Sequence, residues 1–128
     1  MNNISIPIYV ESRYKISRKK VKETVVRVLV EQGVTGPCEV SIAVIGNRKM
    51  RSLNKKYRDI DKTTNVLSFS QTEGDVTMLP PDKLYLGDVV LAYPVVVDEC
   101  ARDNMLIDDR VNELVEHSLM HLLGHHHR

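Results

Sequence analysis

Stretches with the apolar spacing of a strand and stretches with the spacing of a helix alternate along this chain of 128 residues. The segment ISIPIYV has an apolar residue at every second position from Ile4 to Val10, which predicts a half-buried strand, and Pro7 suits a sheet edge. Apolar residues then recur at helical spacing between Ser17, a predicted N-cap, and Gly33. A chain with this alternation is expected to pack helices on a sheet.

The rest of the chain continues the alternation. Further strands are predicted in CEVSIAVIG, NVLSFSQ and LYLGDVVLAY. Helices are predicted in NRKMRSLNKKYR, capped by Asn47, in PVVVDECARDN, with Pro94 in its first turn, and from Asp109 to about Leu123, capped by Asp108. The predicted fold class is α+β, with a mixed sheet of about four strands and packed helices in one domain over residues 1–128.

Composition excludes several classes of protein. With 42% apolar and 27% charged residues, the chain is expected to be a soluble globular protein rather than a disordered one. The N-terminal segment lacks a signal-peptide pattern, and no run approaches the roughly 20 apolar residues of a membrane span, so a cytoplasmic protein is expected. Cys38 and Cys100 lie in apolar surroundings without paired spacing, which favours buried thiols over a disulfide.

The charges nearly cancel over the whole chain, with 18 basic and 17 acidic residues. The basic residues nevertheless form two clusters, one over residues 13–22 and one over residues 48–58. Each cluster is either a solvated helix face or a surface that binds phosphate groups, and the sequence leaves both readings open.

All five histidines of the chain lie in its last twelve residues, HSLMHLLGHHHR. His117 and His121 are four residues apart on the predicted helix and therefore share one face. Gly124 is predicted to end the helix in a left-handed turn, which would bring His127 back to the same cation. Three imidazoles with an open fourth position are typical of a catalytic zinc site on the last helix and the turn after it. A purification tag explains neither the helical pair nor the glycine.

The spacing is also that of zinc peptidases with the motif H-E-x-x-H-x-x-G-x-x-H. In those enzymes a glutamate after the first histidine is the general base, whereas this chain has Ser118. A peptidase is therefore a weak alternative. Glu113, one turn before His117, is predicted either as an outer-shell partner of the metal or a base, or as an exposed salt-bridging residue.

Three motifs together resemble those of the YbeY family of metal-dependent endoribonucleases, which are ribosomal RNA maturation factors. HSLMHLLGHHH is similar to the family's H-G-x-L-H-L-x-G-Y-D-H, and LGDVVL is similar to its L-G-D-I-V-I. YRDIDKTTNVLSFS resembles Y-R-x-x-D-x-P-T-N-V-L-S-F-P. The main departures from these patterns are at Thr63, Ser70, Ser118, His125 and His126.

The resemblance implies one divalent metal ion, with zinc as the expected ion, held by His117, His121 and His127. It implies that Arg58 binds phosphate across a cleft, because a guanidinium presents two parallel donors and stays charged. The alternative for Arg58 is a salt bridge to Asp59 or Asp61. Ser68 and Asp88 are expected either in the substrate cleft or in structural roles, and no residue is assigned as general base.

The leading hypothesis is a metal-dependent endoribonuclease acting on single-strand-type RNA in ribosomal RNA maturation and small-subunit quality control. Its expected partners are ribosomal RNA and the small ribosomal subunit, with neither DNA nor a membrane. The alternatives are a non-catalytic, metal-stabilised ribosome assembly factor and a zinc hydrolase of another class. With one Phe and five Tyr, recognition of the RNA backbone or shape is favoured over sequence-specific stacking on bases.

Overall fold

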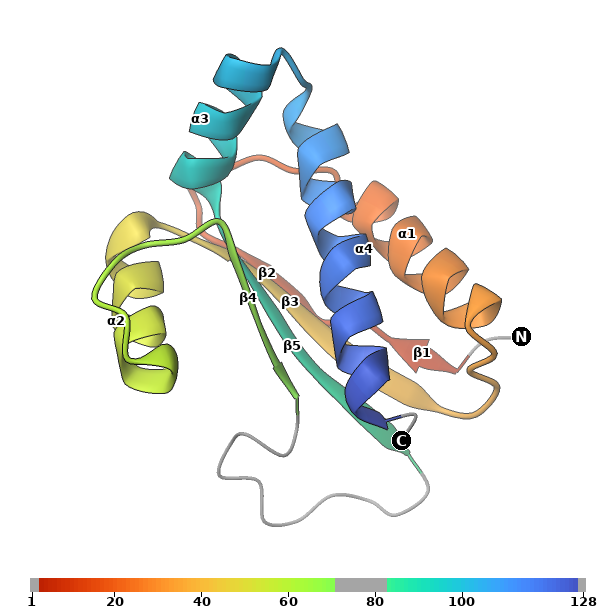
Figure 1. Cartoon of the computed structure of the whole chain (residues 1–128). Helices are drawn as coiled ribbons and strands as arrows, with labels where there is room; N and C mark the ends of the chain where they lie inside the picture. Colours follow the sequence, from red (N-terminus) through yellow and green to blue (C-terminus); the bar gives the residue numbers. More distant parts are fainter. Residues whose placement is uncertain (1–2, 71–82, 127–128) are drawn as a thin grey trace.

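A computed structural model of the chain describes residues 3–70 and 83–126, the last two by backbone alone (Figure 1). The described segments fold into β1 (Ile4–Ser5), β2 (Ile8–Val10), α1 (Arg18–Glu31), β3 (Cys38–Ile45), α2 (Asn47–Arg58), β4 (Val66–Ser70), β5 (Leu84–Ala92), α3 (Tyr93–Asp103) and α4 (Ile107–His126). The predicted α+β class is confirmed. No helix in these segments is long and apolar enough to span a membrane.

The sheet is mixed, as predicted. Its strand order is β1-β3-β5-β4, with β2 also paired to β3, and β4 is the antiparallel strand among parallel ones. The first predicted strand is split into β1 and β2, so the described sheet has five strands rather than about four. Pro7 causes the break because it has no N–H to donate, although its carbonyl still accepts from the Ile42 amide at 2.9 Å. Its edge position is confirmed.

The main core lies between the sheet and the helix pair α1 and α4, which run side by side over one face (Figure 1). Alternate β3 residues, from Cys38 to Val44, are buried in this core. The two helices are joined by the Arg27–Glu116 ion pair at 2.8 Å and by a Thr24–Asn112 hydrogen bond at 2.8 Å. A second, smaller core under α2 contains the alternate residues of the same strands and therefore lies on the opposite face.

The helix starts were predicted with mixed success. Ser17 caps α1 as predicted, and its Oγ accepts from the Lys20 amide at 3.2 Å. The predictions for α2 and α4 are wrong, because Gly46 is the N-cap of α2 and Asp108 lies inside the first turn of α4. The side chains of Asn47 and Asp108 instead join distant segments: Asn47 Oδ1 accepts from the Thr63 hydroxyl at 3.1 Å, and Asp108 Oδ1 accepts from the Ser17 amide at 2.9 Å.

The predicted end of the last helix is also wrong. Helix α4 continues through Gly124 to His126, and Gly124 is not among the residues with positive φ. A glycine inside a helix costs about 1 kcal/mol relative to alanine. Leu122 and Leu123 in the same turn are buried, and burial of each stabilises that turn by about 1.5–3 kcal/mol. Packing on the sheet therefore outweighs the local preference of Gly124.

The cysteine prediction is confirmed. Cys38 and Cys100 are buried free thiols. Burial raises the pKa of both thiols, because an apolar environment disfavours the thiolate.

Candidate functional site

His117 and His121 lie one turn apart on α4, and both are exposed. The other flank of α4 packs beside α1, where Glu116 reaches Arg27. The histidine flank is therefore turned away from α1, toward the side of the sheet where α4 packs on β4 and β5. The two imidazoles are placed so that one cation could contact both.

Gly87 allows α4 to sit close to the sheet at this end. Its φ is +147°, and a Cβ added there would overlap the Phe69 carbonyl oxygen and lie 3.1 Å from Leu122 Cδ2. Only glycine adopts this conformation readily and leaves room for both neighbours. Because Leu122 directly follows His121, the glycine of LGDVVL sets the distance between the sheet and the histidine-bearing turn.

A polar network joins the start of β4 to α4 through α3. Asn65 Nδ2 donates to Glu99 Oε2 at 3.1 Å, and Arg110 Nη2 lies 2.9 Å from Glu99 Oε1. Arg110 also donates to Glu113, and hydrogen bonds to these two glutamates raise its pKa. Neither Glu99 nor Arg110 was predicted as a site residue from the sequence. The signal for this network is Glu99 itself, an acidic residue among the apolar residues of a predicted helix.

Glu113 forms a salt bridge, which was one of the roles predicted for it from the sequence. It lies on α4 one turn before His117, is half exposed, and pairs with Arg110. An outer-shell contact with a metal stays a prediction. Ser118 is buried in the core, so its side chain points away from the exposed histidine flank.

Arg58, the last residue of α2, is held against the outer edge of β4. Its Nη2 donates to the Ser68 carbonyl at 2.9 Å, and its guanidinium carbon lies 4.9 Å from the centre of the Phe69 ring. Asp61, one of its two alternative partners, pairs instead with Arg51 at 2.7 Å. The hydrogen bond from Arg51 lowers the pKa of Asp61. The structure thus orients Arg58 through a backbone carbonyl and an aromatic face.

Ser68 and Asp88 lie on neighbouring strands but face opposite sides of the sheet. Ser68 is paired with Val89, a residue of the core under α4, whereas Asp88 is paired with Phe69 of the core under α2. Asp88 accepts a hydrogen bond from Ser41 on that second face. The structure therefore does not bring Asp88 together with His117 and His121. Its observed contact is the hydrogen bond from Ser41, and a place for Asp88 in the substrate cleft stays a prediction.

Two of the three predicted ligands can be placed. Strand β4 lies between the histidine flank of α4 and Arg58, and the third ligand, His127, lies outside the described residues. Within residues 3–70 and 83–124, no group of three His, Cys, Asp or Glu side chains is placed to hold a metal. Two exposed imidazoles at helical spacing are nevertheless suitable donors for a zinc ion that takes further ligands.

Comparison with known proteins decides the family. The family model described as "Endoribonuclease YbeY" matches residues 8–128. The chain belongs to the YbeY family. Proteins named Endoribonuclease YbeY are 35% identical over 124 residues in Clostridium perfringens and 33% identical over 113 residues in Acinetobacter baumannii. These alignments cover 85% and 88% of this chain, and 74% and 72% of the relatives.

A solved structure shares the fold of this chain. The solution structure of a Thermotoga maritima protein matches 91% of this chain and 71% of its own length, with a TM-score of 0.60 and 20% identity.

One departure from the YbeY motifs has a hydrogen-bond partner in the structure, because Thr63, at a proline position of the family, donates to Asn47. A second, Ser70, is buried at the end of β4.

Proposed function

We propose that this chain is a metal-dependent endoribonuclease that hydrolyses single-strand-type RNA during ribosomal RNA maturation and small-subunit quality control in the cytoplasm. The observation that carries the proposal is the YbeY family match over residues 8–128, which includes every motif residue of the candidate site. Two further observations support it: His117 and His121 lie together on one exposed flank, and Arg58 is oriented on the other side of β4. Free buried cysteines fit a reducing compartment.

Arg58 has the chemistry to hold the scissile phosphate. Its planar guanidinium can donate to two phosphate oxygens and remains charged at any working pH. The Ser68 carbonyl and the Phe69 ring already orient the group, so less side-chain entropy is lost when a phosphate binds. Donors aimed at the equatorial oxygens stabilise the charge that develops there in the transition state.

His117 and His121, with His127, are proposed to hold one divalent ion, and the imidazole donors favour zinc. When bound, such an ion acts as a Lewis acid and lowers the pKa of water. Imidazoles ligate a metal ion in their neutral form, so the affinity for the ion is expected to weaken in acid.

Cleavage of a structured ribosomal RNA fragment by purified protein tests the proposal. Chelator and His121→Ala are expected to abolish cleavage, and Arg58→Ala to reduce it by about 100-fold, as for other transition-state donors. Arg102→Ala is the matched control, because it removes an exposed guanidinium from α3, where Arg102 pairs with the neighbouring Asp103. Cleavage that survives in His121→Ala would mean a contaminating nuclease and would overturn the proposal.

A non-catalytic assembly factor is the second candidate. It is favoured by the position of the histidines on the last turns of α4, where a metal would lock the helix end on the sheet. This candidate predicts that chelator lowers the melting temperature while no RNA is cut at any ratio of protein to RNA.

A further inference from the structure

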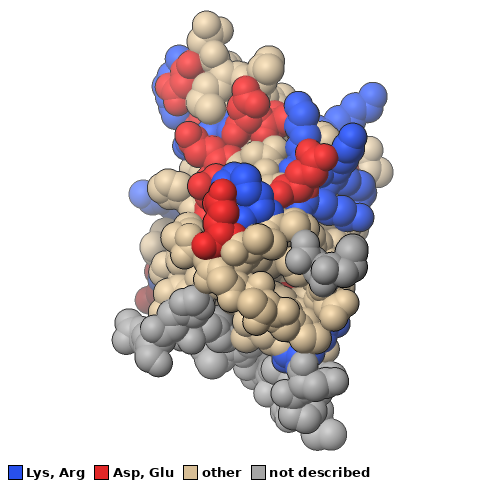
Figure 2. Space-filling model, turned by 90° about the vertical axis from the view of Figure 1, so that its right-hand side faces the viewer, with Lys and Arg blue, Asp and Glu red and all other residues tan. Residues whose placement is uncertain are grey.

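Helix α2 carries the densest positive charge of the described structure. Its twelve residues include six basic side chains and no acidic one, although the whole chain has a formal charge of only +1. The basic residues are Arg48, Lys49, Arg51, Lys55, Lys56 and Arg58. Helix α1 differs, because Glu23 and Glu31 lie among its basic residues. On the side of the molecule in Figure 2, acidic and basic side chains lie next to one another.

Part of this charge is not compensated by carboxylates. Lys49 pairs with Glu11 at 3.2 Å and Arg51 pairs with Asp61 at 2.7 Å. Arg48 and Lys55 are exposed, and no ion pair joins either of them to a carboxylate in the part of the chain that the structure describes, although the charge of Lys55 helps to lower the pKa of Asp61. An anionic ligand can therefore bind them without displacing an internal ion pair.

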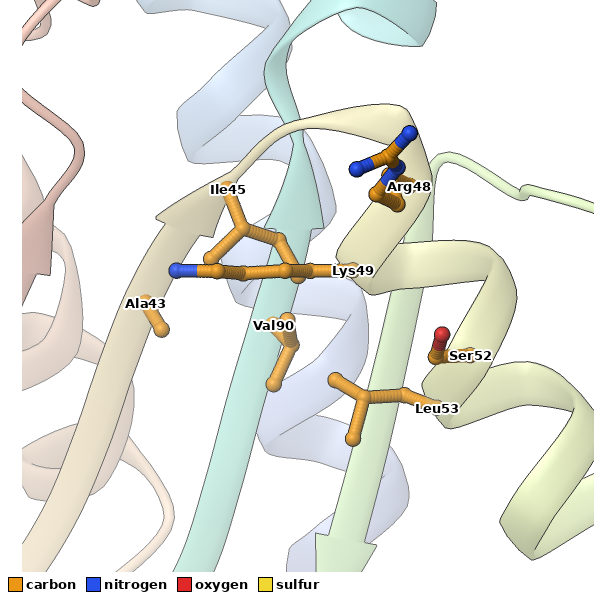
Figure 3. A pocket seen from close by; sticks show the side chains of 7 residues that line it. All are labelled: Ala43, Ile45, Arg48, Lys49, Ser52, Leu53 and Val90. Carbon is orange, nitrogen blue, oxygen red and sulfur yellow. The ribbon is translucent and has the colours of Figure 1, made fainter.

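An apolar hollow lies under the N-terminal half of α2, on the sheet face opposite α4. It has a volume of about 410 Å³, and its lining residues are Ala43, Ile45, Arg48, Lys49, Ser52, Leu53 and Val90. Figure 3 shows aliphatic side chains from β3, β5 and α2 facing the hollow, with Lys49 extending across it toward β3, the strand that carries Ala43. An apolar floor with a cationic rim suits a ligand that has both a flat apolar part and a negative charge.

An exposed aromatic ring borders this hollow. Tyr9 on β2 is 54% exposed and is paired in register with Ala43, so its side chain lies on the same sheet face. The Lys49 ammonium lies 5.9 Å from the centre of the Tyr9 ring. An exposed ring beside a basic residue is a common platform for stacking an unpaired nucleobase.

We propose that the hollow and the solvent face of α2 bind a single-stranded segment of RNA. One unpaired base occupies the apolar floor beside Tyr9, and the phosphates follow the basic face from Arg48 toward Arg58. The ten helical rises from Arg48 to Arg58 span about 15 Å, which matches about four nucleotides at a stacked rise of about 3.4 Å. The inference rests on the proposed function, because Arg58 is where this track meets the candidate cleavage site.

Single-stranded RNA fits the surface better than a duplex or an acidic protein. A stacked base needs an exposed π-face, which a duplex does not offer. The hollow is small and bordered by one aromatic ring, whereas an acidic protein would need a larger apolar patch to form a stable complex. The position of Tyr9 also modifies the expectation, drawn from the few aromatic residues, that the protein recognises only the RNA backbone or shape. One tyrosine beside the hollow can stack a base even when aromatic residues are few.

Binding of a labelled 12-nucleotide single-stranded RNA, measured by fluorescence anisotropy, tests the proposal, with the RNA checked for integrity after each titration. Arg48→Gln is expected to weaken binding several-fold and to reduce the slope of log affinity against log salt by about 0.7. Tyr9→Ala is expected to weaken binding about five-fold or more, whereas Tyr9→Phe keeps the ring and should stay within two-fold. Lys19→Gln is the matched control, since it removes one exposed charge from α1.

Several results would overturn the proposal. Equal effects of Arg48→Gln and Lys19→Gln would show that binding depends on overall charge and not on this surface. An unchanged affinity in Tyr9→Ala would show that no base stacks beside Tyr9 in the hollow. An acidic peptide that displaces the RNA while Tyr9→Ala has no effect would assign the surface to a protein partner. Binding is measured separately from cleavage, so RNA that binds with this pattern but is never cut would refute the proposed function and leave this site standing.

Discussion

Replacement of Gly87 by alanine tests how the histidine-bearing helix is held on the sheet. At φ +147° an L-residue is strained, and the new Cβ would overlap the carbonyl oxygen of Phe69 on the paired strand β4. That oxygen belongs to backbone and cannot rotate away, as a side-chain atom could. Strand β4 must therefore move relative to β5, and the Leu122 side chain of α4 must shift with it.

The magnitude follows from two separate terms. Backbone strain at such a φ costs about 1–3 kcal/mol, and overpacking of a filled core costs about 1–3 kcal/mol more. We expect Gly87→Ala to lose about 4 kcal/mol of unfolding free energy. For a domain of this size that loss lowers the melting temperature by about 15 °C. Urea unfolding and thermal unfolding followed by circular dichroism measure both quantities.

Substitutions at two other glycines separate the cost of backbone strain from the cost of overpacking. Gly33 has φ +83° but its added Cβ would meet no described atom within 4 Å, so Gly33→Ala should cost about 1–2 kcal/mol from strain alone. Gly36 has neither a positive φ nor a near neighbour among the described residues, and Gly36→Ala should change stability by less than about 0.5 kcal/mol. If Gly87→Ala is no more destabilising than Gly33→Ala, the close approach of Leu122 and Phe69 to Gly87 is refuted.

Three further predictions concern other parts of the chain. Gly124→Ala should stabilise the fold by about 0.5–1 kcal/mol in urea unfolding, because the residue is helical; a loss of stability would indicate a left-handed turn instead. The Arg51–Asp61 pair should stabilise the fold above the ordinary carboxyl pKa of about 3.9 and lose this effect as the pH falls through the lowered pKa of Asp61. Carboxyl titration by NMR should show that pKa rising toward its ordinary value in Arg51→Gln, and an unchanged pKa would contradict the pairing. At pH 8 the two cysteines should react with iodoacetamide far more slowly in the native protein than in urea, because burial raises their pKa; equal rates would show that the thiols are accessible.

Local patterns in the sequence were sufficient to predict which segments form helices and strands and to place His117 and His121 on one face of a helix. The alternation of Ile4 to Val10, the cap at Ser17 and the four-residue spacing of His117 and His121 all depend on neighbours within one turn or one strand. Such short-range relations are set by backbone geometry, so they can be predicted without knowing the rest of the fold. The family motifs added Arg58 as a phosphate-binding residue, and that role stays a prediction.

Only the tertiary structure decided which distant groups meet. Asp108 accepts from Ser17, 91 residues away, instead of capping its own helix. Asp88 turned out to lie on the face opposite α4, because strand register, and not its motif, determines which side it occupies. Helix α4 passes through Gly124, since burial of two leucines on the sheet stabilises its last turn more than glycine weakens it. Partners far apart in sequence are selected by packing of the whole sheet, and that information is absent from any local stretch.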